Sequence, residues 1–268
     1  MESNLLPILK WPGSKRWFVK YLNEYLPKYY KTYIEPFFGS GSVFFALEPK
    51  KAVLSDINKE LITTYRLVRD EWASVKEYLQ ELEMKHDEKM YYQVRDLEPE
   101  TNFDVAVRMM YLNRTCFNGI YRVNEKGKFN VPIGSFRNII KSTDDFRSTS
   151  KALKKAKLIC SDFEKVIDAA TKNDLIFADP PYTVSHNFNG FIGYNEKLFS
   201  WDDQIRLADS LERAAKRGVN IIATNADHYS VRKLYKERGF KLKTVSRYSS
   251  IAAKKESRNL YKELIILS

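Results

Sequence analysis

The stretch Leu175-Ile176-Phe177-Ala178 followed by Asp179-Pro180-Pro181-Tyr182 decides the fold. A short apolar run of this kind is typical of a strand buried on both faces of a parallel sheet. The two prolines lack the N–H groups that would continue the strand, so it ends at the carboxyl edge of the sheet, where open α/β folds bind ligands. A carboxylate, the Pro180 carbonyl and an aromatic ring follow this end, and together they suit a planar base with an exocyclic amine. The competing interpretation is an ordinary turn after a strand.

The residues on both sides of this strand repeat an α/β pattern. Further strands are expected at 32–34, 52–55, 157–160, 219–224, 241–247 and 260–267. A helix should begin after Ser200, with Asp203 at its third position as in a capping box, and end at Gly218. Helices are expected at 17–26, 43–47 and 229–238, and between the strands at 58–69, 72–85, 88–96 and 103–113. We therefore expect an α/β fold in which residues 58–149 form an inserted, mainly helical subdomain and residues 1–57 and 150–268 form the main domain.

Charge and cysteine content narrow the class of protein. The chain has 268 residues, a net charge of +11 and a pI near 9.4, which favours a polyanionic partner such as nucleic acid or an anionic membrane surface. No apolar run approaches the roughly 18 residues of a membrane span, and the first ten residues lack the pattern of a signal peptide. Two cysteines and three histidines show neither disulfide nor metal-ligand spacing. We expect a cytoplasmic protein without a metal.

Three segments near the N-terminus carry ligand-binding chemistry. Trp11-Pro12-Gly13-Ser14-Lys15 places a tryptophan and a lysine in one turn. Glu35-Pro36-Phe37-Phe38-Gly39-Ser40-Gly41 joins a strand to a helix, and its glycines allow a ligand to approach the backbone closely. It lacks the third glycine of a dinucleotide fingerprint and the Gly-Lys-Ser/Thr of a P-loop. Asp56 ends the next strand, where it can accept hydrogen bonds from ribose hydroxyls or cap the following helix.

A basic segment follows the predicted helices. Aromatic and β-branched residues flank Asn124-Glu125-Lys126-Gly127, which predicts a hairpin with Gly127 at positive φ. Seven basic residues and one acid lie between positions 108 and 141, which suits a DNA groove, although a solvated charged face would look similar. The basic residues are Arg108, Arg114, Arg122, Lys126, Lys128, Arg137 and Lys141. The polar loop 183–198 is long for a compact domain, which is typical of a functional or a disordered segment.

Taken in order, these motifs resemble the Dam-like family of N6-adenine DNA methyltransferases of the α class. The ordered set also contains Leu112-Asn113-Arg114, Phe117-Asn118-Gly119, Tyr121-Arg122 and Phe129-Asn130-Val131-Pro132. The resemblance covers nearly the whole chain. It implies a Rossmann-like S-adenosylmethionine-dependent methyltransferase sheet, with residues 58–149 as a target-recognition domain that carries the hairpin.

The resemblance also implies roles for particular residues. Asp179 and Pro180 would accept hydrogen bonds from the target amine, and Tyr182 would stack on an adenine flipped out of duplex DNA. The residues implied to bind S-adenosylmethionine are Trp11, Lys15, Phe37, Gly39, Gly41, Asp56, Asp162, Phe163 and Asp179. Those implied to contact DNA are Arg114, Phe117, Asn118, Arg122, Lys126, Lys128, Pro132 and Arg137. Phe117 would wedge beside the flipped base and Arg122 would read a guanine, as in family members that recognise GATC.

Several alternatives stay open at this point. An N4-cytosine DNA methyltransferase has a similar amine target, and RNA or protein-glutamine methyltransferases use similar pockets. A DNA-binding protein without catalytic activity is a fourth alternative, against which the intact Asp179, Gly39, Gly41 and Asp56 argue. A restriction endonuclease acting on the same DNA site is a candidate partner, and the sequence does not decide the oligomeric state.

Overall fold

The computed structural model describes residues 5–124, 127–135, 138–183, 199–248 and 260–268. The chain forms two compact units, of which the first contains Met1–Glu24 and Phe38–Cys160 and the second contains Tyr25–Phe37 and Ser161–Ser268. The predicted domain boundaries at residues 57/58 and 149/150 differ from the limits of these units and stay a prediction. The predicted loop 183–198 lies almost entirely outside the described residues.

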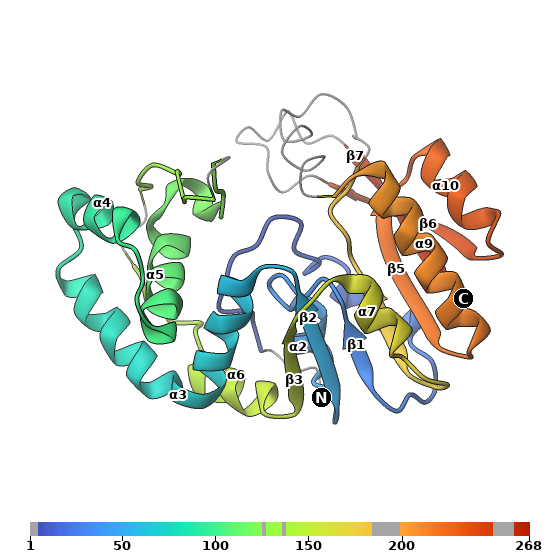
Figure 1. Cartoon of the computed structure of the whole chain (residues 1–268), viewed down its shortest axis with the longest axis horizontal. Helices are drawn as coiled ribbons and strands as arrows, with labels where there is room; N and C mark the ends of the chain where they lie inside the picture. The colour runs from blue at the N-terminus through green and yellow to red at the C-terminus, as the bar shows by residue number, and fades with distance from the viewer. Residues whose placement is uncertain (1–4, 125–126, 136–137, 184–198, 249–259) are drawn as a thin grey trace. The chain divides into compact units, whose positions relative to one another are not determined.

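The second unit contains most of the strands (Figure 1). Its strands are β1 (Tyr33–Glu35), β4 (Leu175–Ala178), β5 (Asn220–Ala226), β6 (Lys241–Tyr248) and β7 (Leu260–Leu267). Its helices are α7 (Phe163–Asp168), α9 (Trp201–Lys216) and α10 (Tyr229–Lys236). Every residue of β4 is buried, as the apolar run predicts for a strand with parallel neighbours on both sides.

The first unit is mainly helical. Its strands are β2 (Ala52–Asp56) and β3 (Ala156–Cys160), which pair in parallel with Leu54 opposite Leu158. Its helices are η1 (Val19–Tyr21), α2 (Ser42–Leu47), α3 (Lys59–Met84), α4 (Glu88–Asp96), α5 (Asn102–Thr115), η2 (Phe117–Gly119) and α6 (Phe146–Leu153). The short α1 (Leu22–Tyr25) lies at the junction with the second unit. Helix α3 packs against α5 and α6.

The seven strands form one mixed sheet in the order β3-β2-β1-β4-β5-β7-β6. Strand β4 pairs in parallel with β1 and with β5, whereas β7 runs antiparallel to both β5 and β6. Residues that follow β4 and the last residues of β5 therefore lie at one edge, and the residue of β7 opposite Ala226 is Glu263. This edge carries the Asp179–Tyr182 motif.

The helix boundaries follow local sequence signals closely. Ser200 and Asp203 form the predicted capping box at the start of α9. The two helices predicted at 58–69 and 72–85 appear as α3, whose backbone is non-helical at Glu71. The helix predicted across 17–26 is confirmed in part, because η1 and α1 follow one another directly and together cover residues 19–25. Tight turns such as Phe18 N–H to the Lys15 carbonyl precede η1, and Pro27 restricts Leu26 just after α1.

None of the helices in the described ranges is long and apolar enough to cross a membrane.

Candidate active site

The carboxylate of Asp179 is held by a hydroxyl from the neighbouring strand. Thr224 Oγ1, on β5 and fully buried, donates a hydrogen bond of 2.7 Å to Asp179 Oδ1. Thr224 follows Ala223, the residue that pairs with Ala178 immediately before Asp179. The strand register therefore places the hydroxyl beside the carboxylate, where it restrains one oxygen.

Tyr182 is anchored by a carboxylate from the far side of β5. Its hydroxyl donates a short hydrogen bond to Glu263 Oε2, and Glu263 lies on β7 with no exposed surface. Tyr182 itself is only partly buried. The phenol end of the ring is therefore held by a buried acceptor, while part of the side chain stays accessible.

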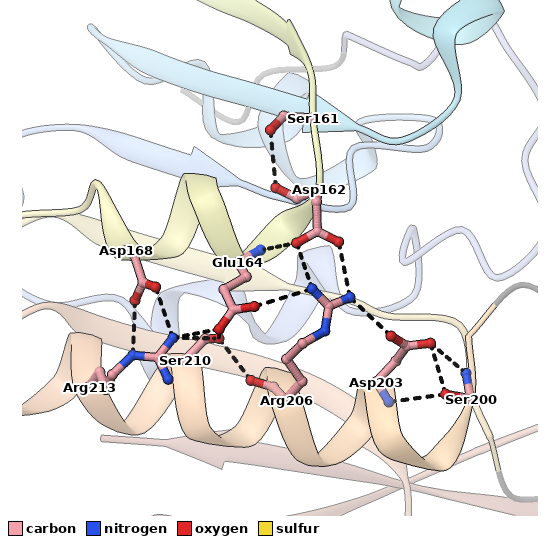
Figure 2. A network of polar contacts seen from close by, with 9 residues as sticks. All are labelled: Ser161, Asp162, Glu164, Asp168, Ser200, Asp203, Arg206, Ser210 and Arg213. Atoms are coloured by element: carbon pink, nitrogen blue, oxygen red, sulfur yellow. Dashed lines mark hydrogen bonds and ion pairs between the residues drawn. The ribbon is translucent and has the colours of Figure 1, made fainter.

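Two residues at the start of α7 bear the predicted adenine contacts. Asp162 caps this helix, because its side chain accepts the Glu164 N–H. The Phe163 ring is 5% exposed and stacks on the Phe37 ring, with 5.3 Å between centroids and 29° between planes. Arg206 on α9 binds Asp162 through both terminal nitrogens, as Figure 2 shows. Phe37, Asp162 and Phe163 thus form one group within the second unit.

The glycine-rich turn lies in the first unit and packs against Trp11. Gly39 has φ +47°, and a Cβ at this position would lie 2.8 Å from Trp11 Cδ1. Gly41 has φ +68° and precedes α2, and a Cβ there would lie 2.4 Å from the Phe38 ring. Neither position accepts a side chain without a shift of its neighbours, which explains both glycines.

Asp56 links the end of β2 to this turn. Its Oδ2 accepts the Gly39 N–H at 3.0 Å, and its Oδ1 accepts the Asn58 N–H at 2.9 Å. Burial raises the pKa of Asp56, although the N–H groups of Asn58 and Gly39 act in the opposite direction. The residue that caps α3 is Asn58, whose side chain accepts the Leu61 N–H. Asp56 therefore fixes the glycine turn rather than capping the helix.

Trp11 and Lys15 occupy different environments in the turn that they share. The Trp11 indole stacks on Tyr121, with 5.4 Å between ring centroids. The hydroxyl of Tyr121 donates to Glu60. The Lys15 side chain is 5% exposed, and its ammonium donates to the Gly13 carbonyl at 3.0 Å. The ammonium is thus held inside the turn.

The predicted DNA contacts in the first unit are largely on its surface. Phe117 is 54% exposed, and Asn118 beside it is exposed with φ +57°. Arg122 is exposed and donates from Nε to Asn130 Oδ1 at 3.0 Å. Lys128 is exposed and pairs with Glu98, and the exposed Pro132 accepts the Phe117 N–H. Lys126 and Arg137 lie outside the described residues.

Arg114 differs from these surface residues. It is 4% exposed, pairs with Asp144 at 2.8 Å and donates to the Ile8 carbonyl. Its neighbour Asn113 makes two hydrogen bonds to the backbone of Lys10. Leu112-Asn113-Arg114 therefore ties α5 to the N-terminal segment. We leave Arg114 out of the DNA-contacting set proposed below, because its guanidinium is committed inside the fold.

Sequence reasoning missed three residues that hold the predicted ones. Thr224 lies on the strand beside β4, one residue beyond the partner of Ala178, so its position near the carboxyl edge could have indicated a role. Glu263 is a lone acid in an apolar strand, Leu260–Leu267, which is unusual for a buried position. Arg206 gave no signal, since it is one of several charged residues along an amphipathic helix.

These groups are what an α/β enzyme acting on a nucleotide-like ligand needs. The glycine turn beside the Asp56 carboxylate suits a ribose diol. The aromatic rings beside the Asp162 carboxylate suit an adenine. S-adenosylmethionine contains both groups. No group of residues suited to a metal occurs within the part of the chain that the structure describes.

Comparison with known proteins identifies the family. Residues 11–251 match the model of the D12 class N6 adenine-specific DNA methyltransferases. Type II methyltransferase M1.LlaDCHI of Lactococcus lactis subsp. cremoris is 32% identical, over 98% of this chain and 95% of its own length. Type II methyltransferase M.MjaIII of Methanocaldococcus jannaschii is 36% identical, over 97% of this chain and 98% of its own. DNA adenine methylase of Vibrio cholerae is 31% identical, over 97% and 94%.

The chain therefore belongs to the D12 class N6 adenine-specific DNA methyltransferase family. It is an adenine-specific DNA methyltransferase that uses S-adenosyl-L-methionine, and it contains a mixed seven-stranded sheet. The resemblance drawn from the motifs is confirmed. The N4-cytosine, RNA, protein-glutamine and inactive alternatives are set aside, because the family is adenine-specific and acts on DNA.

Proposed function

We propose that Asp179 and the Pro180 carbonyl accept the two N–H bonds of the target adenine amine. The observation that carries this proposal is the hydrogen bond from the buried Thr224 hydroxyl to Asp179 Oδ1. A buried hydroxyl that holds one carboxylate oxygen keeps the whole carboxylate in a fixed orientation. This preorganised arrangement is the kind that stabilises developing charge without reorganisation during the reaction.

The chemistry follows from the weak nucleophilicity of the adenine amine, whose lone pair is delocalised into the ring. Two acceptors favour a pyramidal nitrogen with a localised lone pair, and they stabilise the positive charge that develops as the nitrogen is methylated. The amine is out of reach inside a duplex, so the base must flip out of the helix. Tyr182 then stacks on the adenine in place of the neighbouring bases. The Glu263 contact supports this role by fixing the phenol end of the ring.

Nine residues are proposed to contact the cofactor. Among them the Asp56 carboxylate suits the ribose hydroxyls, and Asp162 suits the exocyclic amine of adenine. The others are Trp11, Lys15, Phe37, Gly39, Gly41, Phe163 and Asp179. When bound, S-adenosylmethionine supplies a methyl group activated by a positively charged sulfur. The chain's own residues hold and orient this donor.

Residues 58–149 are proposed as the target-recognition domain, and 1–57 with 150–268 as the catalytic domain. The exposed residues Phe117, Asn118, Arg122, Lys128 and Pro132 support this, as does the turn in which Val123 bridges Phe129 in antiparallel register. Lys126 and Arg137 are included on the sequence alone. We propose double-stranded DNA as the partner and GATC or a related short sequence as the target.

A restriction endonuclease acting on the same site is a further proposal. It is supported by the type II methyltransferase names of two relatives. Purified protein should then protect its modified DNA against an endonuclease that cuts the unmodified target.

The residue roles are tested by Asp179→Ala and Thr224→Val. Asp179→Ala should reduce tritium transfer from labelled S-adenosylmethionine by at least about 10²–10³-fold, the effect of removing one preorganised group, while DNA binding survives. Thr224→Val keeps the shape of the buried side chain and should lower transfer by a smaller factor. Wild-type turnover in Asp179→Ala would refute the assignment.

The target sequence is tested by expression in a host that lacks adenine methylation, followed by single-molecule sequencing of its DNA. GATC would support the roles of Phe117 and Arg122. Another single motif would keep the chemistry and discard that reading of the two residues.

A further inference from the structure

Arg206 is at the centre of a network between α7 and α9 that does more than join two helices (Figure 2). Its Nη1 donates to Asp162 Oδ1 at 2.9 Å and its Nη2 donates to Asp162 Oδ2 at 3.0 Å. The same guanidinium pairs with Glu164 at 3.2 Å and with Asp203 at 2.9 Å. The hydrogen bond to Asp162 is the largest of the effects that raise the pKa of Arg206, so this cation stays charged. A planar bidentate contact of this kind fixes the direction of the carboxylate.

The Asp162 carboxylate can accept one further hydrogen bond. An ionised carboxylate offers about four lone-pair positions. In the described part of the chain, three donors engage the Asp162 side chain, namely Nη1 and Nη2 of Arg206 and the N–H of Glu164. Oδ1 accepts two of them and Oδ2 accepts one. One acceptor position therefore remains on Oδ2, and the side chain is about one-third exposed.

Arg206 also supports the aromatic group next to Asp162. Its Cζ lies 4.3 Å from the centroid of the Phe163 ring, a cation–π distance. Phe163 in turn stacks on Phe37 and contacts Phe199, and it retains only 5% exposure. Phe37 is the partly exposed ring of this group, whereas Phe163 and Phe199 are buried. The ring that a ligand can reach is therefore Phe37, and Phe163 acts as its support.

We propose that Arg206 is a positioning residue for the adenine end of the cofactor. It directs Oδ2 of Asp162 toward one exocyclic N–H of adenine, and it braces the Phe163 ring beneath Phe37. This inference rests on the proposed roles of Asp162, Phe163 and Phe37. It assigns to Arg206 the selection of a ligand that carries an amine at the adenine C6 position.

The competing role for Arg206 is a purely structural link between helices, and the chain contains a control for it. Arg213 lies on the same helix α9 and pairs with Glu164 and with Asp168 on α7 (Figure 2). It shares Glu164 with Arg206, but within the described residues its ion pairs are with Glu164 and Asp168 and not with Asp162. Arg213→Met therefore removes comparable ion pairs between the helices without disturbing the proposed adenine contacts.

The experiment compares two ligands by calorimetry, S-adenosylhomocysteine and S-inosylhomocysteine, in which a carbonyl replaces the adenine amine. A site that accepts a hydrogen bond from an N–H discriminates against the analogue that lacks it. Wild-type protein should bind S-adenosylhomocysteine at least about tenfold more tightly than S-inosylhomocysteine. Arg206→Met should weaken S-adenosylhomocysteine about tenfold and bring the ratio close to one, whereas Arg213→Met should keep the wild-type ratio.

The outcomes separate this inference from the proposed function. If Arg206→Met keeps the wild-type ratio, or if Arg213→Met lowers it equally, the inference is overturned and the network is structural. Arg206→Lys keeps the charge but loses the bidentate contact, so it should also lower the ratio, and it replaces the Met variant if that protein fails to fold. Wild-type protein that binds neither ligand and transfers no methyl group would instead refute the proposed cofactor residues.

Discussion

The Asp179–Tyr182 motif and the surface loop from Phe117 to Asn130 are held in opposite ways. The motif's polar side chains are restrained by buried partners on neighbouring strands, Thr224 for Asp179 and Glu263 for Tyr182. The loop's functional candidates, Phe117 and Arg122, are exposed. Arg122 has an exposed partner in the same loop, Asn130.

The difference suggests how the protein divides chemistry from recognition. Methyl transfer needs acceptors that are already oriented, and buried partners supply this orientation before any substrate arrives. Reading DNA needs side chains that can reach base edges and phosphates, so their partners should be easily exchanged. Variants in both regions should separate the two kinds of restraint, and the buried Arg114–Asp144 pair should show the largest effect.

Asp144→Ala should have the largest effect on stability. It leaves the buried Arg114 guanidinium without its ion-pair partner, and breaking a buried pair in this way costs about 3–5 kcal/mol. Chemical denaturation of wild-type and variant protein measures this loss. Asp96→Ala is the control, because it breaks an exposed pair with Arg95 and should cost far less. Equal losses of stability in both variants would show that the buried Arg114–Asp144 pair contributes no more than an exposed pair.

Glu263→Gln and Tyr182→Phe should each slow methyl transfer, and their effects on kcat should not be additive. Tyr182→Phe removes the hydrogen bond, whereas Glu263→Gln keeps an acceptor oxygen but removes the charge that strengthens the bond, and a hydrogen bond to a charged group contributes about 1.5–3 kcal/mol. The double variant should therefore resemble Tyr182→Phe in kcat, with DNA affinity little changed. Glu237→Gln, an exposed site on the same unit, is the control. Additive losses in kcat would mean that Glu263 does not act through Tyr182.

Arg122→Ala should relax discrimination at one position of the target. Loss of a bidentate contact with guanine costs about 1–3 kcal/mol at that base pair and little elsewhere. Methylation rates on a set of single-base variants of the target measure this. Lys85→Ala, an exposed lysine of the same unit, should leave the pattern unchanged. If discrimination is unaltered at every position, Arg122 has no role in reading the sequence.

Lys128→Ala should have the smallest effect on stability. Its ion pair with Glu98 is largely exposed on both sides, and exposed pairs contribute little to stability. The melting temperature should stay near that of the wild type, while DNA affinity should fall with a shallower salt dependence. A salt dependence identical to that of the wild type would remove Lys128 from the phosphate contacts.

The strands and helices could be predicted from the sequence because their signals are local. The apolar run Leu175–Ala178 became β4 with the same bounds, and Ser200 with Asp203 began α9. The break expected after residue 69 appeared at Glu71. The helix expected across 17–26 is shorter than predicted, covering residues 19–25, because tight turns occupy its first residues and the propensity of individual residues does not reveal them.

The candidate site was only partly predictable for a physical reason. Motifs named the residues that would touch ligands, but the residues that hold them come from elsewhere in the chain. Glu263 reaches Tyr182 through the register of β7 on β5, and Arg206 reaches Asp162 through the packing of α9 on α7. Arg114 illustrates the converse. A basic residue in a basic segment looks like a DNA contact until Asp144, 30 residues away, is found beside it.

The Glu263 anchor has a consequence for biosynthesis. Tyr182 leaves the ribosome 81 residues before its partner, and β7 carries that partner while pairing with both β5 and β6. Until β7 is synthesised, the nascent chain contains the surface loop and Asp179, but Tyr182 lacks its Glu263 acceptor. A chain clipped before β7 should therefore fail to methylate DNA, because Tyr182 loses its anchor and β5 and β6 lose the strand between them.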